Sequence, residues 1–229
     1  MFAIWLFWKH KNNIVFQNKP IQCRLRFEVY RTAIEFDYCA KALRGVYQHV
    51  IRRVRWEKPD IGWVKLNSDG SSRGNPSVAG SGGLIRNEKG EWICGFARRI
   101  RITTSFAAEL WGLRDGILQC LNPNLSSVLI ELDAKSIVDL LVNSDYSNNA
   151  ISPLVDDCRS LMAQLPRVQI KHCFREANRC ADGLARLGAK QSGDFLLFNC
   201  SPMDIIDLFN FDANGLYLNR LCPELVFSL

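Results

Sequence analysis

The chain has 229 residues, of which 48% are hydrophobic, and its formal net charge at pH 7 is +6. This length and hydrophobic content are enough for one domain with extensions, or for two small domains. Nine cysteines are present, but none forms a CxxC pair and there are only three histidines. The sequence therefore argues against a zinc site or a disulfide framework and favours reduced, buried thiols.

The positive charge is concentrated at the N-terminus. Residues 1–59 contain 12 Lys and Arg against 4 Asp and Glu, a net of +8, whereas residues 60–229 contain 17 against 19, a net of −2. Apolar residues recur at roughly helical spacing in the second half of residues 1–59, which predicts a helical basic extension. Basic and aromatic side chains cluster near its end: Tyr47, Arg52, Arg53, Arg55, Trp56 and Lys58.

Two interpretations of this basic extension stay open. It could be an arm that contacts the phosphates of a nucleic acid. A solvated amphipathic helix that packs on the domain or serves as a linker is at least as good an interpretation. The apolar MFAIWLFW at its start is too short to span a bilayer and lacks the basic leading region of a signal peptide. We therefore expect an intracellular protein, nuclear or cytoplasmic, that is neither secreted nor bound to a membrane.

The first acid of interest lies in KLNSDGSSRGNP, which begins with a strand pattern. Leu66 and Ser68 alternate with Asn67 and Asp69, so a half-buried strand places Asp69 on its polar side. The DGSSRGNP stretch is rich in turn residues. SGGLIRN, NEKG and EWICGFARR then predict two further strands joined as a hairpin.

The second acid lies in TTSFAAELWGLRDGILQC, which has helical periodicity. The apolar residues at this spacing mark the buried face of the helix: Phe106, Leu110, Leu113, Ile117 and Leu121. Glu109 is three residues after Phe106 and four before Leu113. It therefore lies at the border of the buried face, in or near the first turn of the helix.

The third and fourth acids follow the same alternation of strand and helix. Asp133 ends the strand pattern SSVLIELD, at the position where open α/β sheets bind their ligands. Helices are predicted near 134–142 and 154–165, and RVQIKHCF predicts another strand. In the final helix, REANRCADGLARLGAK, Asn178 and Asp182 are four residues apart and share a face.

Four carboxylates in this order can converge on one point. A site made only of carboxylates suits a hard divalent cation and, with it, phosphodiester chemistry. A single acid at a helix start is more often a solvated residue that compensates the helix dipole. Four converging acids are harder to explain in this way, because they would repel one another without a metal.

These motifs resemble those of the type 1 ribonuclease H family. The matching segments are DGSSRGNP around Asp69, AAELWGL around Glu109, ELDAKSIVDLL around Asp133 and REANRCADGLARLG around Asp182. More narrowly, AELWGL together with REANRCADGLA is similar to the RNase H-like domains of plant proteins derived from non-LTR retrotransposons. The resemblance runs from about residue 63 to residue 190, and it depends on four motifs in the family's order and spacing.

The resemblance implies an α/β fold, with a mixed five-stranded sheet flanked by helices. It also implies that the four acids hold two Mg²⁺ ions, for which Mn²⁺ could substitute, beside the scissile phosphate of an RNA/DNA hybrid. Asp69 would hold both ions, Glu109 and Asp133 mainly the ion on the nucleophile side, and Asp182 the ion on the leaving-group side. No small-molecule cofactor is expected.

Further residues are implied as contacts to the nucleic acid. By family position, Asn75, Ser105 and Lys135 would contact the 2′-hydroxyl groups of the RNA strand, and Thr104 would hold a phosphate of the DNA strand. Thr104 and Ser105 could equally be helix N-caps. Asn178, which shares a helix face with Asp182, is a further candidate for nucleic-acid binding.

Two departures from the family pattern affect the predicted function. Ser77 stands where the family has a glycine after GNP, so the turn loses backbone freedom there. His172 stands ten residues before Asp182, at the count of an auxiliary loop histidine in many members, but QIKHCF reads as a strand. Absence of a loop histidine would predict slower turnover, with a preference for manganese.

The sequence therefore predicts three parts and leaves two functions open. The parts are a basic N-terminal extension over residues 1–59, an RNase H-like domain over 60–190, and a C-terminal extension over 191–229 that forms a packed segment or a short hairpin. The favoured function is a metal-dependent endonuclease that cuts the RNA strand of RNA/DNA hybrids. The alternative is a weak or inactive nucleic-acid-binding module that kept the fold.

Overall fold

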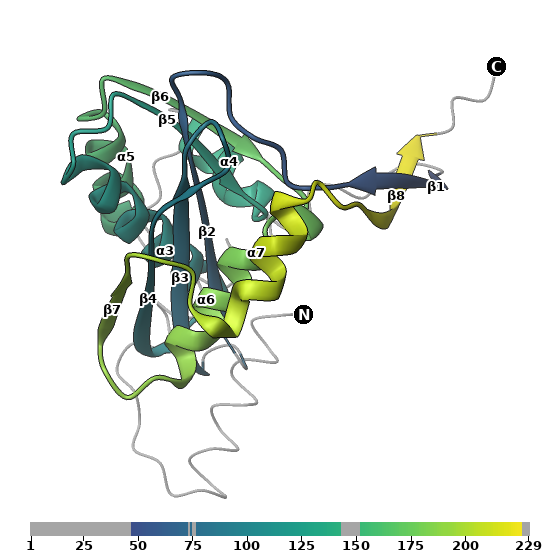
Figure 1. The fold of residues 1–229 in the computed structure, drawn as a ribbon. Coiled ribbons are helices and arrows are strands. Elements are labelled where there is room, and N and C mark those ends of the chain that lie inside the picture. The colour runs from purple at the N-terminus through teal and green to yellow at the C-terminus, as the bar shows by residue number, and fades with distance from the viewer. Residues whose placement is uncertain (1–46, 73, 75–76, 143–151, 226–229) are drawn as a thin grey trace, which may run out of the picture.

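The computed structural model describes residues 47–72, 74, 77–142 and 152–225. Within these ranges, six strands form a mixed sheet in the order β6-β5-β2-β3-β4-β7, and two more form a separate ribbon (Figure 1). The strand bounds are β1 Tyr47–Val54, β2 Val64–Ser72, β3 Ser77–Arg86, β4 Trp92–Thr103, β5 Ser127–Leu132, β6 Arg167–His172, β7 Phe195–Phe198 and β8 Leu218–Leu225.

The predicted mixed sheet is confirmed, with one strand added. β2, β3 and β4 are antiparallel neighbours, whereas β5 pairs parallel with β2 and β6 parallel with β5. These are the five predicted strands. β7 pairs antiparallel with β4 and comes from the segment after residue 190. Its four residues form an apolar run in the sequence, but nothing local indicates that β4 is its partner.

Helices cover both faces of the sheet. Neighbouring strand residues point to opposite faces, and accordingly Ile85 belongs to a core shared with α3 and α5, whereas Leu84 packs against α6. Figure 1 shows α7 beside α6, in front of the sheet. The helix bounds are α3 Ser105–Leu121, α4 Lys135–Val142, α5 Ser152–Met162, η1 Arg175–Ala177, α6 Arg179–Lys190, η2 Met203–Ile205 and α7 Ile206–Ala213.

Two glycines let helices approach the sheet closely enough to bring acids together. A Cβ on Gly70 of β2 would lie 2.2 Å from the backbone nitrogen of Glu109 in α3. A Cβ on Gly82 of β3 would lie 2.4 Å from the nitrogen of Ala185 in α6. Gly82 is the cross-strand partner of Asp69. Because glycine has no side chain, α3 can pack directly on β2 and α6 directly on β3, on either side of the position of Asp69.

The predicted helical extension is wrong for the part that the structure describes. Tyr47–Val54 is the strand β1, which pairs antiparallel with β8. The alternation that buries Val54 while Arg53 and Arg55 are exposed belongs to a strand. Local periodicity could not reveal this, because the pairing strand is more than 160 residues away along the chain. Residues 1–46 lie outside the described residues.

The segment after residue 190 is a packed extension, not a short hairpin. Its helix α7 carries Asp212, whose Oδ2 lies 2.9 Å from Nη1 of Arg86 on β3, and both side chains are almost fully buried. Arg86 also donates to Asn67 Oδ1 at 3.1 Å, and Trp56 Nε1 donates to the same oxygen at 2.9 Å. Arg86 stacks over the Trp56 ring at 3.5 Å. This buried network holds α7 on the sheet.

The remaining expectations from composition can be checked only for the described ranges. All seven cysteines there are free, and Cys200 is the exposed one. No helix in the described part of the chain is both long and apolar enough to cross a membrane.

Candidate active site

The four predicted acids reach one cavity from four different elements. Asp69 lies on β2, Glu109 on α3, Asp133 directly after β5, and Asp182 in the first turn of α6. All four line a cavity of about 370 Å³. The fold therefore brings together acids that are up to 113 positions apart in the sequence. Two come from the neighbouring strands β2 and β5, and two from the helices α3 and α6 on opposite faces of the sheet.

Three of the acids form a tight cluster. Asp69, Glu109 and Asp133 each present a carboxylate oxygen, and these three oxygens lie within 4.8 Å of one another. Asp182 lies outside this cluster but lines the same cavity. Its carboxylate forms an ion pair with Arg186, one turn later on α6, with Nη2 2.7 Å from Oδ2. The site is thus a cluster of three acids with a fourth at its edge.

Burial and mutual repulsion make the cluster unfavourable for unneutralised charge. Burial raises the pKa of Asp69 well above its ordinary value, and the charges of Asp133 and Asp182 raise it further. Burial likewise raises the pKa of Glu109 well above its ordinary value, with added repulsion from Asp69 and Asp133. The Gly70 N–H, which donates to Glu109 Oε2 at 3.1 Å, opposes this shift in Glu109. Protons or a bound cation would relieve the repulsion.

The donor set fits a divalent metal ion. Carboxylate oxygens are the ligands that Mg²⁺ and Mn²⁺ prefer. Asn178 also lines the cavity and is almost fully buried. Its Nδ2 donates to the Ser68 carbonyl at 3.0 Å and to Asp133 Oδ1 at 3.3 Å, whereas its Oδ1 has no hydrogen-bond partner among the described residues. A buried amide oxygen of this kind fits a ligand that brings a donor or a cation.

The other predicted contact residues are only partly brought to the cavity. Ser105, the first residue of α3, is exposed and lines it. Thr104 is instead buried and caps α3, since its Oγ1 accepts from the Ala107 nitrogen at 3.2 Å. Lys135 is not among the lining residues, and its Nζ contacts Asp139 at 2.9 Å. Asn75 lies outside the described residues.

His172 is a strand residue, as its sequence context predicts. It ends β6 and does not line the cavity. Its ring packs edge-on against Phe174, with centroids 5.6 Å apart. Burial lowers the pKa of His172, although a hydrogen bond to the Asp133 backbone opposes this shift. The imidazole is therefore held behind the Asp133 backbone, outside the cavity.

Two arginines that sequence reasoning did not single out also line the cavity. Arg175 Nε lies 3.1 Å from Asp133 Oδ2, while its side chain is 84% exposed. Arg186 pairs with Asp182. A signal for Arg186 was available, because it follows Asp182 by four residues on a helix. Arg175 begins the short helix η1 and shares no local pattern with Asp133, so only the fold brings the two residues together.

The chain is similar to known proteins over most of its length. The family described as Reverse transcriptase-like matches residues 67–188. The Arabidopsis thaliana protein named Putative ribonuclease H protein At1g65750 is 35% identical over 220 residues, which cover 93% of this chain and 35% of that protein. The chain thus spans about a third of the length of this curated relative.

Solved structures share the fold of the central domain. The N-terminal RNase H domain of Rv2228c from Mycobacterium tuberculosis matches with a TM-score of 0.53 and 24% identity, over 56% of this chain and 93% of that chain. LC11-RNase H1, isolated from compost and solved in complex with an RNA/DNA hybrid, matches with a TM-score of 0.50 and 26% identity. That match covers 55% of this chain and 96% of the other.

Proposed function

Since the chain belongs to the Reverse transcriptase-like family, whose domain is RNase H-like, we propose that it is a metal-dependent endonuclease that hydrolyses the RNA strand of RNA/DNA hybrids. The observation that carries the proposal is the cluster of three carboxylate oxygens within 4.8 Å, with Asp182 on the same cavity. The proposal draws on LC11-RNase H1 for the substrate class, because that structure holds an RNA/DNA hybrid.

The proposed roles of the acids are those that the resemblance to type 1 ribonucleases H implies, and their positions support them. Asp69 belongs to the three-acid cluster and its pKa also responds to Asp182, so it would share both Mg²⁺ ions. Glu109 and Asp133 would hold the ion on the nucleophile side, and Asp182 the one on the leaving-group side. The chemistry that bound Mg²⁺ supplies is activation of the attacking water and stabilisation of the leaving 3′ oxygen. Mn²⁺ would suit the same oxygen ligands.

The neighbouring polar groups would position the ligands and the substrate. Asn178 would hold Asp133 in place, because its Nδ2 donates to Asp133 Oδ1. The Oδ1 of Asn178 has no hydrogen-bond partner among the described residues, so it could accept a hydrogen bond from the substrate. Arg175 and Arg186 neutralise Asp133 and Asp182 in the metal-free protein. If the carboxylates held a divalent cation instead, both guanidinium groups would be free to donate to phosphate oxygens of the substrate. The Ser105 hydroxyl at the start of α3 would contact the sugar of the RNA strand.

The test is cleavage of an end-labelled RNA/DNA hybrid by the full chain, first with Mg²⁺ and then with Mn²⁺. An RNA/RNA duplex and the Asp133→Asn variant serve as controls. We expect cleavage of the hybrid alone, with 5′-phosphate and 3′-hydroxyl products, and at least a hundredfold loss in the variant. Cleavage that persists in Asp133→Asn would sink the assignment of the site.

One set of observations favours a second function, a hybrid-binding module with little or no catalysis. His172 is held outside the cavity, and two of the four carboxylates are already paired with arginines. Folded protein that binds the hybrid but cleaves it with neither metal would establish this alternative. Fold alone does not decide between the two functions.

A further inference from the structure

The strands β1 and β8 form a ribbon that projects from the body of the protein (Figure 1). They pair antiparallel over their whole length, from Tyr47 opposite Leu225 to Val54 opposite Leu218. We call this ribbon, together with Arg55 and Tyr217 that flank it, the arm. Because side chains alternate along a strand, the arm has an inner face and an outer face with different residues.

The inner face of the arm is seated beside the candidate active site. Val54 is buried and packs with Cys173, Ala177 and Phe174, which lie in and around η1. From β8, Arg220 Nη1 lies 2.9 Å from Glu176 Oε2, and its guanidinium stacks over Phe174 at 4.7 Å. Glu176 directly follows Arg175, which lines the cavity. These contacts fix the arm relative to the cavity.

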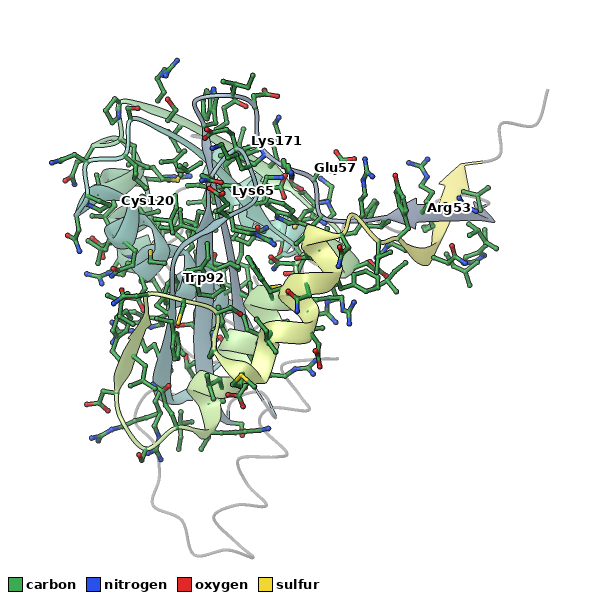
Figure 2. All side chains as sticks on the ribbon, viewed as in Figure 1. Arg53, Glu57, Lys65, Trp92, Cys120 and Lys171 are labelled. Atoms are coloured by element: carbon green, nitrogen blue, oxygen red, sulfur yellow. The ribbon has the colours of Figure 1, made fainter. Side chains whose placement is uncertain are left out.

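The outer face is exposed and basic. It carries His49, Ile51 and Arg53 from β1, opposite Pro223, Leu221 and Asn219 from β8. Ile51 is 68% exposed and Leu221 66% exposed. Figure 2 shows Arg53 on the ribbon, away from the body of the protein. Arg55 continues the series and lies over the Tyr217 ring, 4.7 Å from its centroid.

The charge of the arm complements a polyanion. The arm, residues 47–55 and 217–225, contains four arginines and one acid, Glu224, whereas residues 60–229 as a whole carry a net of −2. Glu57 is exposed and 3.8 Å from Arg55, a separation at which a surface ion pair contributes little. None of the six paired outer-face residues just named is acidic. Arg53 and Arg55 are two residues apart, which spaces them about 6.6 Å along an extended chain.

We infer that the outer face of the arm binds the phosphate backbone of the same nucleic acid whose scissile strand enters the cavity. The inference rests on the proposed function for the identity of that nucleic acid. Arg53 and Arg55 would each contact phosphates, since guanidinium groups donate well to phosphate oxygens. Ile51 and Leu221 lie between the cations and would pack against sugar rings. Contacts of this kind add affinity without sequence specificity.

The experiment compares hybrid binding and cleavage by the full chain and by Arg53→Ala/Arg55→Ala. The matched control is Arg99→Ala/Lys190→Ala, which removes two exposed charges near the β4 and β7 edge of the sheet. We expect the arm variant to bind a long hybrid about tenfold more weakly at 0.15 M salt, with a salt slope lower by about two. We expect its kcat at saturating hybrid to be unchanged, because the arm does not line the cavity.

The outcomes separate this inference from the proposed function. If the protein cleaves the hybrid but the arm variant keeps its affinity and salt slope, the inference about the arm is rejected and the proposed function stands. An equal loss of affinity in the control variant also rejects the inference about the arm. Loss of affinity in a protein that never cleaves supports the arm and rejects the nuclease. Arg53→Lys/Arg55→Lys, which keeps the charge, should retain most of the affinity. If affinity falls in both arm variants together with the melting temperature, misfolding explains it and the inference fails.

Discussion

Two of the places where the described residues bury charge treat it in opposite ways. At Arg86 and Asp212 a cation and an anion leave water together, with side chains 1% and 2% exposed and atoms 2.9 Å apart. Asp69, which is buried, and Glu109, which is half-buried, lie beside a third acid, and no ion pair reaches either of them among the described residues. Burial without a partner costs far more than burial with one.

This difference distinguishes a structural ion pair from a candidate binding site. The charges of Arg86 and Asp212 balance each other within the chain, where Asn67 also accepts from Arg86 and the Cys180 thiol donates to Asp212 at 3.3 Å, while Arg86 Nε has no hydrogen-bond partner among the described residues. The pair therefore holds α7 on the sheet. Within the chain, Arg175 pairs with Asp133 of the acid cluster, but Asp69 and Glu109 have no cation as partner among the described residues, so their charges are relieved by a proton or a cation from outside. Repelling carboxylates lower the stability of the protein without ligand, and a bound ligand restores that stability. This is the behaviour expected of a binding site.

The largest expected effect comes from breaking the satisfied pair. Arg86→Met should lower the free energy of unfolding by about 3–5 kcal/mol, because Asp212 is left buried without a cation. Arg86→Met/Asp212→Leu should recover much of that loss, since neither charge then remains. Urea unfolding measures both. If the double variant is as unstable as the single one, packing and not charge explains the role of Arg86.

Breaking the unsatisfied cluster should have the opposite sign. Asp69→Asn removes one of the repelling charges, so the metal-free protein should gain about 0.5–2 kcal/mol of stability. The same variant should lose hybrid cleavage and the rise in melting temperature that Mg²⁺ gives the native chain. Thermal unfolding with EDTA and with Mg²⁺ measures both effects. A loss of stability in EDTA would show that Asp69 is a structural residue.

Much of the acid cluster is visible in the sequence, because each acid lies in a local pattern. Asp69 and Asp133 are tied to strands by alternation, and Glu109 is tied to the border of a helical face. Their convergence then follows from the order of strands in the sheet. Arg86 and Asp212 carry no such signal, since 126 residues separate them and neither lies in a motif. The sequence shows elements and motifs, but not which distant pairs become buried together.

The same limit explains the errors at the edges of the domain. The apolar spacing of β1 loosely fits a helix and predicts one, and only the pairing with β8 makes this segment a strand. Thr104 and Ser105 were equal candidates for the N-cap and the substrate contact. Backbone geometry separates them: Thr104 has extended dihedrals and accepts the capping bond, which leaves Ser105 at the cavity.

The third prediction uses pH. The pKa values of Asp69 and Glu109 are raised in the folded protein, so folding takes up protons above the ordinary carboxyl pKa of about 4. The stability that these protons give is complete below that pH and is lost as pH rises through the raised values. In EDTA, the melting temperature of Asp69→Asn relative to the native chain should therefore increase by a few degrees from pH 4 to pH 8. A constant difference would contradict the raised pKa of Asp69.

The smallest effect is expected at Arg186, whose pair with Asp182 is the exposed counterpart of Arg86 with Asp212. The side chains are 66% and 39% exposed and lie one turn apart on α6, so solvent already screens them. Arg186→Ala should change the free energy of unfolding by less than about 0.5 kcal/mol. It should also lower the Mg²⁺ concentration needed for half-maximal cleavage by about twofold, because a competing cation leaves Asp182. Arg186→Lys, which keeps the charge, is the control and should leave that concentration unchanged.

A loss of stability near that of Arg86→Met would mean that exposure does not set the strength of these pairs, and the contrast between the two regions would fail.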